Sequence, residues 1–125
     1  MAWWPYLIVF AGAGVGGAMR HGMNELVSNL AGTRFPWGIM AINVSGSLLL
    51  GLFAGYFAFK GEASQHWRLF LTTGICGGYT TFSTFSLDTV LLWERGEATM
   101  AIVYVVASVL ISIAALVLGM WAMRG

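Results

Sequence analysis

The sequence predicts an all-α membrane protein with four transmembrane helices in a single domain, residues 1–125. Composition favours this class, because 58% of the residues are hydrophobic and 9% are charged, whereas soluble domains carry about 25% charged residues. The charges also cluster, and they leave four uncharged stretches long enough to cross a hydrocarbon core, which takes roughly 20 residues. These stretches are Met1–Met19, Phe35–Phe59, Leu69–Leu87 and Ala98–Met123.

The first stretch begins with aromatic residues, Trp3, Trp4 and Tyr6, which are typical of a membrane–water interface. It lacks the basic start of a signal peptide, so we expect an uncleaved first helix. Gly12 and Gly16 form a pair of small residues four apart, which favours close packing against another helix.

Positive charge is balanced between the two sides of the predicted membrane domain. Three Lys or Arg residues fall on each side: Lys60, Arg68 and Arg124 on one, and Arg20, Arg34 and Arg95 on the other. Orientation normally follows an excess of positive charge in the cytoplasmic loops. Either a subtler signal sets one orientation, or copies insert both ways and pair as an antiparallel, dual-topology homodimer. A dimer is favoured because four helices are few for enclosing a polar path.

The second stretch carries a stripe of small and polar residues, Asn43, Ser47, Gly51 and Gly55, four residues apart on one helix face. Its glycines predict a packing seam. Asn43 must face protein, water or a ligand, because an unpaired amide in lipid costs several kcal/mol. It therefore makes an interhelical hydrogen bond or donates into a pore.

The third stretch predicts a broken helix. Gly74, Gly77 and Gly78 weaken it, seven Ser or Thr hydroxyls replace apolar residues between Thr72 and Ser86, and the break is expected near Cys76–Thr81. Unwound carbonyls in membrane proteins coordinate Na⁺. Those of Gly77 and Thr80 would give four ligands in an antiparallel dimer, unless water or Thr hydroxyls satisfy them.

Two further sets of side chains form faces on the predicted helices. Phe82 and Phe85, three residues apart, share a face beyond the break. Tyr104, Ser108 and Ser112 share a face of the fourth helix. They form either a row of hydroxyl groups along a polar path, which we call the hydroxyl track, or a seam where small residues pack closely. Asp88 is expected near the interface, where it caps a neighbouring helix or pairs with an arginine.

No motif for enzyme chemistry is present, and the four uncharged stretches contain no carboxylate of the kind that drives proton-coupled transport. Amide and hydroxyl donors with aromatic ring edges suit a small anion, although composition alone leaves the sign of the charge open. A net charge of +1 predicts no nucleic-acid partner, and the single Cys76 excludes an internal disulfide.

The segment Gly74–Ser86, G-x-C-G-G-x-T-T-F-S-T-F-S, resembles the signature of the Fluc (CrcB) fluoride channels. The G-x-x-x-R motif ending at Arg20 and the stretch I-N-V-S-G-S at Ile42–Ser47 support the resemblance, which extends over the whole chain. The resemblance implies a dual-topology antiparallel homodimer in the bacterial inner membrane, with two fluoride pores and one structural Na⁺ at its centre.

Site residues follow from the same resemblance. It implies that Gly77 and Thr80 bind Na⁺ through backbone carbonyls and that Arg20 helps to form a vestibule. The implied pore residues are Asn43, Phe82, Phe85, Ser86, Tyr104, Ser108 and Ser112. The implied role is passive export of cytoplasmic fluoride across the lipid bilayer, which gives fluoride resistance.

Two other classes remain as alternatives. A small dual-topology multidrug/proton antiporter has the same size, but it needs a carboxylate in the first helix, and Met1–Met19 contains none. A non-transporting scaffold protein would carry no ion flux.

Overall fold

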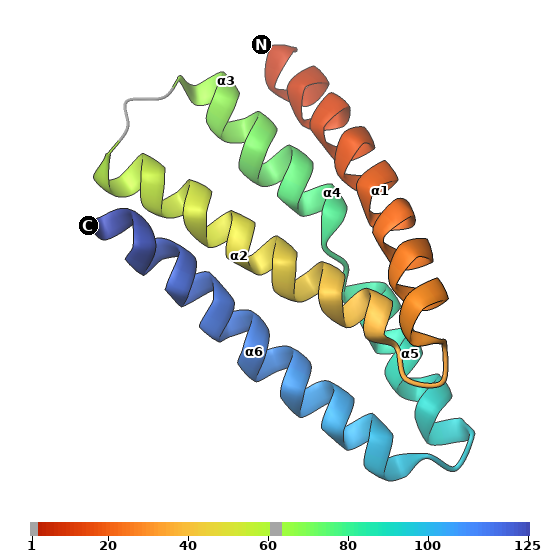
Figure 1. Ribbon diagram of the computed structural model, residues 1–125. Helices are drawn as coiled ribbons and strands as arrows, with labels where there is room; N and C mark the ends of the chain where they lie inside the picture. Colours follow the sequence, from red (N-terminus) through yellow and green to blue (C-terminus); the bar gives the residue numbers. More distant parts are fainter. Residues whose placement is uncertain (1–2, 61–63) are drawn as a thin grey trace.

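The computed structural model describes residues 3–60 and 64–125, and the regular elements in those residues are all helices (Figure 1). In chain order they are α1 (Trp4–Ala31), α2 (Trp37–Phe59), α3 (Gln65–Arg68), the π-helical segment η1 (Leu69–Cys76), α4 (Gly77–Tyr79), α5 (Phe82–Glu94) and α6 (Ala98–Arg124). The all-helical class is the one that the sequence predicts.

Helix α2 packs against α6, and small residues bring the two backbones together (Figure 1). A Cβ atom added at Gly51 would collide with the Leu116 carbonyl, and one added at Gly119 would lie 2.6 Å from the Leu48 carbonyl oxygen. The packing seam predicted for this half of α2 is confirmed, because only glycine allows so close an approach.

Helix α1 packs against η1 and α4 through a second glycine contact. A Cβ atom at Gly12 would lie 2.8 Å from the Gly74 Cα, and one at Gly16 would collide with the Ile75 carbonyl. The close approach predicted from Gly12 and Gly16 is therefore confirmed, and its partner is the glycine-containing η1 segment.

The backbone leaves the helical conformation between α4 and α5. Thr80 (φ −81°, ψ 158°) and Thr81 (φ −151°, ψ 124°) are both extended, and α5 begins at the next residue, Phe82. The Thr81 hydroxyl accepts a hydrogen bond from the Thr84 N–H at 3.2 Å, and so caps the start of α5. We call Thr80–Thr81 the α4–α5 junction.

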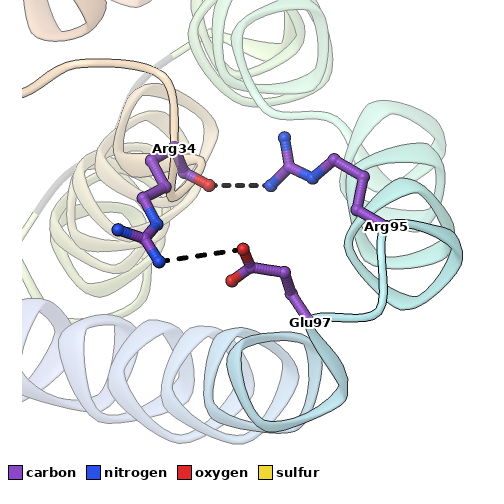
Figure 2. Close-up of polar contacts among 3 residues, drawn as sticks. All are labelled: Arg34, Arg95 and Glu97. Carbon is purple, nitrogen blue, oxygen red and sulfur yellow. Dashed lines mark hydrogen bonds and ion pairs between the residues drawn. The ribbon is translucent and has the colours of Figure 1, made fainter.

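Charged residues gather at the two ends of the bundle. At one end Arg34 lies 3.9 Å from Glu97, and Arg95 donates a hydrogen bond of 2.9 Å to the Arg34 carbonyl (Figure 2). At the other end Lys60 Nζ donates to the Gly125 carbonyl at 3.3 Å, and the Arg124 guanidinium lies 5.4 Å from the Phe59 ring centroid. Arg34 and Arg95 thus share one end, and Lys60 and Arg124 share the other, as the predicted topology requires.

Large apolar side chains are exposed on the outside of the bundle, notably on α6. Six of them on that helix are Ile102, Leu110, Ile113, Val117, Leu118 and Trp121. By length and composition, α2 and α6 are the two helices among the described residues that qualify as membrane spans. Exposed apolar faces of this kind suit a lipid environment or a second protein surface.

Candidate functional site

A groove of about 270 Å³ lies between α2, the α4–α5 junction, α5 and α6. Five of the predicted pore residues line it: Asn43, Phe82, Phe85, Ser108 and Ser112. Its wall also contains Gly46, Ser47, Leu50, Thr80, Thr81 and Val109. The structure therefore brings together residues from three separate parts of the chain that the sequence marks as polar or aromatic stripes.

Asn43 is held against the backbone of the junction by two hydrogen bonds. Its Oδ1 accepts from the Thr81 N–H at 2.9 Å, and its Nδ2 donates to the Thr81 carbonyl at 3.0 Å. The first of the alternatives expected for Asn43, an interhelical hydrogen bond, is thus present. A side-chain amide has two N–H donors, so one remains for another acceptor.

Ser108 and Ser112 contribute two buried hydroxyls that have no hydrogen-bond partner within residues 3–60 and 64–125. A buried polar atom without a partner is destabilising by roughly 1–3 kcal/mol, so natural proteins rarely retain one without a reason. Both residues line the groove, and each O–H is available to a hydrogen-bond acceptor there.

Phe82 and Phe85 both lie on the first turns of α5, with ring centroids 5.7 Å apart. Their environments differ sharply, since Phe85 is 9% exposed and Phe82 is 79% exposed. The shared face predicted from their spacing is confirmed by the ring contact. One ring belongs to the interior of the chain, and the other faces outward beside the groove.

Tyr104 is fully buried, and its ring centroid lies 5.1 Å from that of Phe85. Its hydroxyl donates a 3.3 Å hydrogen bond to Asp88 Oδ2. The structure therefore places Tyr104 behind the groove wall, with its proton engaged. Asp88 is expected to cap a neighbouring helix or pair with an arginine; within the described residues its hydrogen-bond partner is instead this tyrosine on α6.

Two other predicted residues stand apart from the groove lining. The Ser86 hydroxyl donates to the Phe82 carbonyl at 2.9 Å, within its own helix. Arg20 is partly exposed on α1 and does not line the groove. Their predicted roles in a pore and a vestibule remain predictions.

Thr81 is the site residue that sequence reasoning missed. Both of its backbone polar groups bind Asn43, and its hydroxyl caps α5. The available signal was a threonine directly before the Phe82 helix, which is a typical N-cap residue. Its pairing with Asn43, 38 positions away, depends on how α2 packs and has no local signal.

The carbonyls of Gly77 and Thr80 lie where helical hydrogen bonding is interrupted. In a continuous α-helix the Thr81 N–H would bind the Gly77 carbonyl, whereas here it donates to Asn43. Gly77 is exposed, and a Cβ atom added there would meet nothing closer than the Thr72 carbonyl oxygen at 3.8 Å. Among the described residues no cluster of His, Cys, Asp or Glu is able to hold a metal ion. Cation binding at this place would therefore depend on neutral oxygen atoms, those of backbone carbonyls and threonine hydroxyls.

A helical bundle with exposed apolar faces and a groove of amide, hydroxyl and aromatic groups has the form of a membrane channel or transporter. Its sequence matches the CrcB-like protein family, described as camphor resistance (CrcB), over residues 7–120. The chain belongs to this family.

Several curated proteins are similar to the chain over nearly its whole length. Fluoride-specific ion channel FluC 2 of Nitrobacter hamburgensis is 52% identical over 119 residues, which cover 95% of this chain and 96% of that protein. Fluoride-specific ion channel FluC of Rhodopseudomonas palustris strain BisB5 is 56% identical over 119 residues, with the same coverage. The FluC protein of Granulibacter bethesdensis is 54% identical, over 95% of this chain and 94% of its own length. The predicted class, a non-enzymatic multi-pass bacterial membrane protein, is confirmed.

Proposed function

We propose that this protein is a fluoride-selective ion channel that lets fluoride leave the bacterial cytoplasm passively, and thereby protects the cell. The observation that carries the proposal is the pair of partnerless hydroxyls of Ser108 and Ser112, which lie in one groove with Asn43 and Phe85. The fluoride channel names of relatives 52–56% identical to this chain support the choice of ion.

Fluoride suits this groove for chemical reasons. It is small and strongly hydrated, so it enters a narrow path only where donors replace its water. The remaining Asn43 N–H and the O–H groups of Ser108 and Ser112 are such donors. The positive edges of the rings of Phe82 and Phe85 add weaker contacts that do not bind cations. The described residues that line the groove include no carboxylate.

The pore is completed by a second copy of the chain. The groove opens to one side, and Phe82 is 79% exposed beside it, so a single chain supplies half of an enclosed path. An antiparallel homodimer places two such grooves between its subunits and gives two pores. The equal positive charge at the two sides of the domain supports insertion in both orientations.

The four membrane spans are α1, α2, the run from α3 to α5, and α6. In the third span the helix is broken at the α4–α5 junction, because the extended Thr80 and Thr81 interrupt it. Irregular backbone at membrane depth is tolerated where protein or a polar cavity surrounds it. The contact of Asn43 with Thr81 supplies such surroundings.

A structural Na⁺ fits the Gly77 and Thr80 carbonyls at the centre of the dimer. Na⁺ binds oxygen ligands, and unwound membrane helices supply them as carbonyls. The Gly77 carbonyl has lost its helical hydrogen-bond partner, and an added Cβ at Gly77 would meet nothing closer than 3.8 Å, which fits an external ligand there. When bound, the ion supplies positive charge that holds the two junctions together.

The remaining predicted residues have supporting roles. Tyr104 supports Phe85 from behind the groove wall, Ser86 follows Phe85 on α5, and Arg20 belongs to a vestibule that attracts anions. The hydroxyl track begins at Ser108 in this arrangement, because the Tyr104 proton is bound to Asp88.

Ion efflux from liposomes tests the function directly. Purified protein is reconstituted in liposomes that contain potassium fluoride or potassium chloride, with valinomycin as the potassium shunt. We expect rapid loss of fluoride, retention of chloride, and no requirement for a pH gradient. Retention of both ions by folded, dimeric protein would refute the channel, and flux that depends on a pH gradient would favour an antiporter.

A further inference from the structure

An unbroken series of aromatic rings connects the groove with the end of the bundle. The ring centroids of Phe82 and Phe85 are 5.7 Å apart, those of Phe85 and Tyr104 are 5.1 Å apart, and those of Tyr104 and Phe35 are 5.5 Å apart. Phe35 in turn lies 4.6 Å from Trp37. Tyr104 is thus held between Phe85 on the groove side and Phe35 on the loop side.

Phe35 belongs to the loop between α1 and α2, yet it packs against the hydrophobic core. Its ring meets Tyr104 at an interplanar angle of 89°, an edge-to-face contact that fixes both rings. The Phe35 carbonyl also accepts a 2.8 Å hydrogen bond from the Trp37 N–H. The loop therefore supplies a fixed side chain to the rear of the groove wall.

The backbone directly before Phe35 is tied to the turn between α5 and α6 (Figure 2). Arg95 donates to the Arg34 carbonyl at 2.9 Å, and the Arg34 guanidinium lies 3.9 Å from Glu97 Oε1. Figure 2 shows both contacts bridging the space between the loop and the turn. We call these three residues the end clasp.

We propose that Phe35 is a positioning residue for the ion path: it holds Tyr104, and through Tyr104 it holds Phe85, while the end clasp holds Phe35. The inference rests on the proposed pore, because it concerns the placing of Phe85 in that pore. The rings of Phe35 and Tyr104 do not line the groove, so they act on the ion through the position of Phe85.

The first test compares Phe35→Leu with Phe35→Tyr in the liposome assay. Phe35→Leu keeps apolar volume but loses the ring, and we expect fluoride efflux about tenfold slower, which corresponds to a barrier higher by about 1.4 kcal/mol. The fluoride concentration that gives half-maximal flux should also shift. A smaller amount of folded protein would slow efflux without changing this concentration, so the shift separates the two explanations. Phe35→Tyr keeps the ring and should show wild-type fluoride efflux. Phe57→Leu, near the far end of α2, is the control and should also show wild-type efflux.

Combination with Phe85→Ile separates this inference from the proposed pore. If Phe35 acts through Phe85, Phe35→Leu adds no further loss in a Phe85→Ile background. Normal conduction by Phe35→Leu, with impaired Phe85→Ile, would overturn the inference and leave the pore intact. Normal conduction by Phe85→Ile would overturn the inference and remove Phe85 from the path, whereas the proposed pore itself fails only if the wild type shows no fluoride efflux.

A charge exchange tests the end clasp without altering the core. Glu97→Arg places positive charge beside Arg34 and should shift the half-maximal fluoride concentration in the same direction as Phe35→Leu. Arg34→Glu combined with Glu97→Arg should restore it. Glu25→Gln, which breaks the exposed His21–Glu25 pair of 3.8 Å on α1, should have no effect. Failure of the double variant to differ from Glu97→Arg would overturn the role of the clasp.

Discussion

Asn43 and Thr81 exchange two hydrogen bonds, at 2.9 and 3.0 Å, so that a side-chain amide binds the backbone like a neighbouring peptide group. The exchange satisfies both polar groups of Thr81 where the helix is interrupted. It also fixes α2 relative to the α4–α5 junction. The second N–H of the Asn43 amide takes no part in the exchange and remains available as a donor. A single residue thus stabilises the break and supplies the groove with a hydrogen-bond donor.

Asn43→Asp should therefore reduce both stability and conduction. The carboxylate accepts from the Thr81 N–H but cannot donate to its carbonyl, which should lower the free energy of unfolding by about 1–3 kcal/mol. Negative charge at the groove should also abolish fluoride efflux. Thermal unfolding and liposome efflux measure the two effects, with Asn29→Asp, on the exposed end of α1, as the control. Wild-type efflux in Asn43→Asp would exclude this residue from the path.

Ser108→Ala and Ser112→Ala should separate stability from conduction. Neither hydroxyl has a partner in the part of the chain that the structure describes, so their removal should leave the free energy of unfolding unchanged or raise it by about 1 kcal/mol. Fluoride efflux should fall, because a donor is lost. Ser45→Ala is the matched control, since its hydroxyl lies 2.9 Å from that of Tyr79 and its loss should lower stability. Unchanged efflux in both groove variants would show that these serines only pack.

Phe82→Ile and Phe85→Ile should each strongly reduce fluoride conduction, to a slow rate that is still measurable, while the dimer persists. Isoleucine keeps apolar volume but lacks a ring edge for the anion. Phe85→Ile should also destabilise the chain by about 1–3 kcal/mol, since that ring is buried, whereas Phe82→Ile should leave it as stable as the wild type. Efflux measurements and size-exclusion chromatography test these outcomes. Normal conduction in one variant would remove that ring from the proposed path.

Removal of sodium should lower the thermal stability of the dimer. An ion that binds the folded state alone stabilises it by RT ln(1 + [L]/Kd), about 2.7 kcal/mol at 100 times the Kd. Unfolding temperatures measured in sodium chloride and in N-methyl-D-glucamine chloride should therefore differ. Gly77→Ala should diminish the difference, because the added methyl group, which fits within one chain at 3.8 Å from the Thr72 carbonyl oxygen, would stand beside the bound ion; Gly14→Ala, in open space on α1, should not. Equal unfolding temperatures in the two salts would contradict the sodium site.

The uncharged stretches predict the helices because burying charge in a membrane is costly, and the glycines Gly12 and Gly51 predict close contacts because only small residues permit them. Spacing likewise places Phe82 beside Phe85. It could not show that one ring is buried and the other exposed, because burial depends on what packs around each. Tyr104 shares a face with Ser108, yet its proton is bound to Asp88 on another helix. Such pairings arise from the relative positions of whole helices, which local spacing does not encode.

The π-helical winding of η1 also bears on how this chain can change during evolution. A π-helix places more residues in each turn than an α-helix does, so Leu69–Cys76 contains a local surplus of chain. Because the wider turn takes up this surplus, deletion of one residue there would let the segment rewind as α-helix with its two ends in nearly the same relative orientation. The same deletion from a segment already wound as α-helix would turn its two ends relative to each other by about 100°. The η1 segment is therefore a place where the run from α3 to α4 can lose a residue and keep its packing, provided that a glycine stays opposite Gly12, where a side chain has no room.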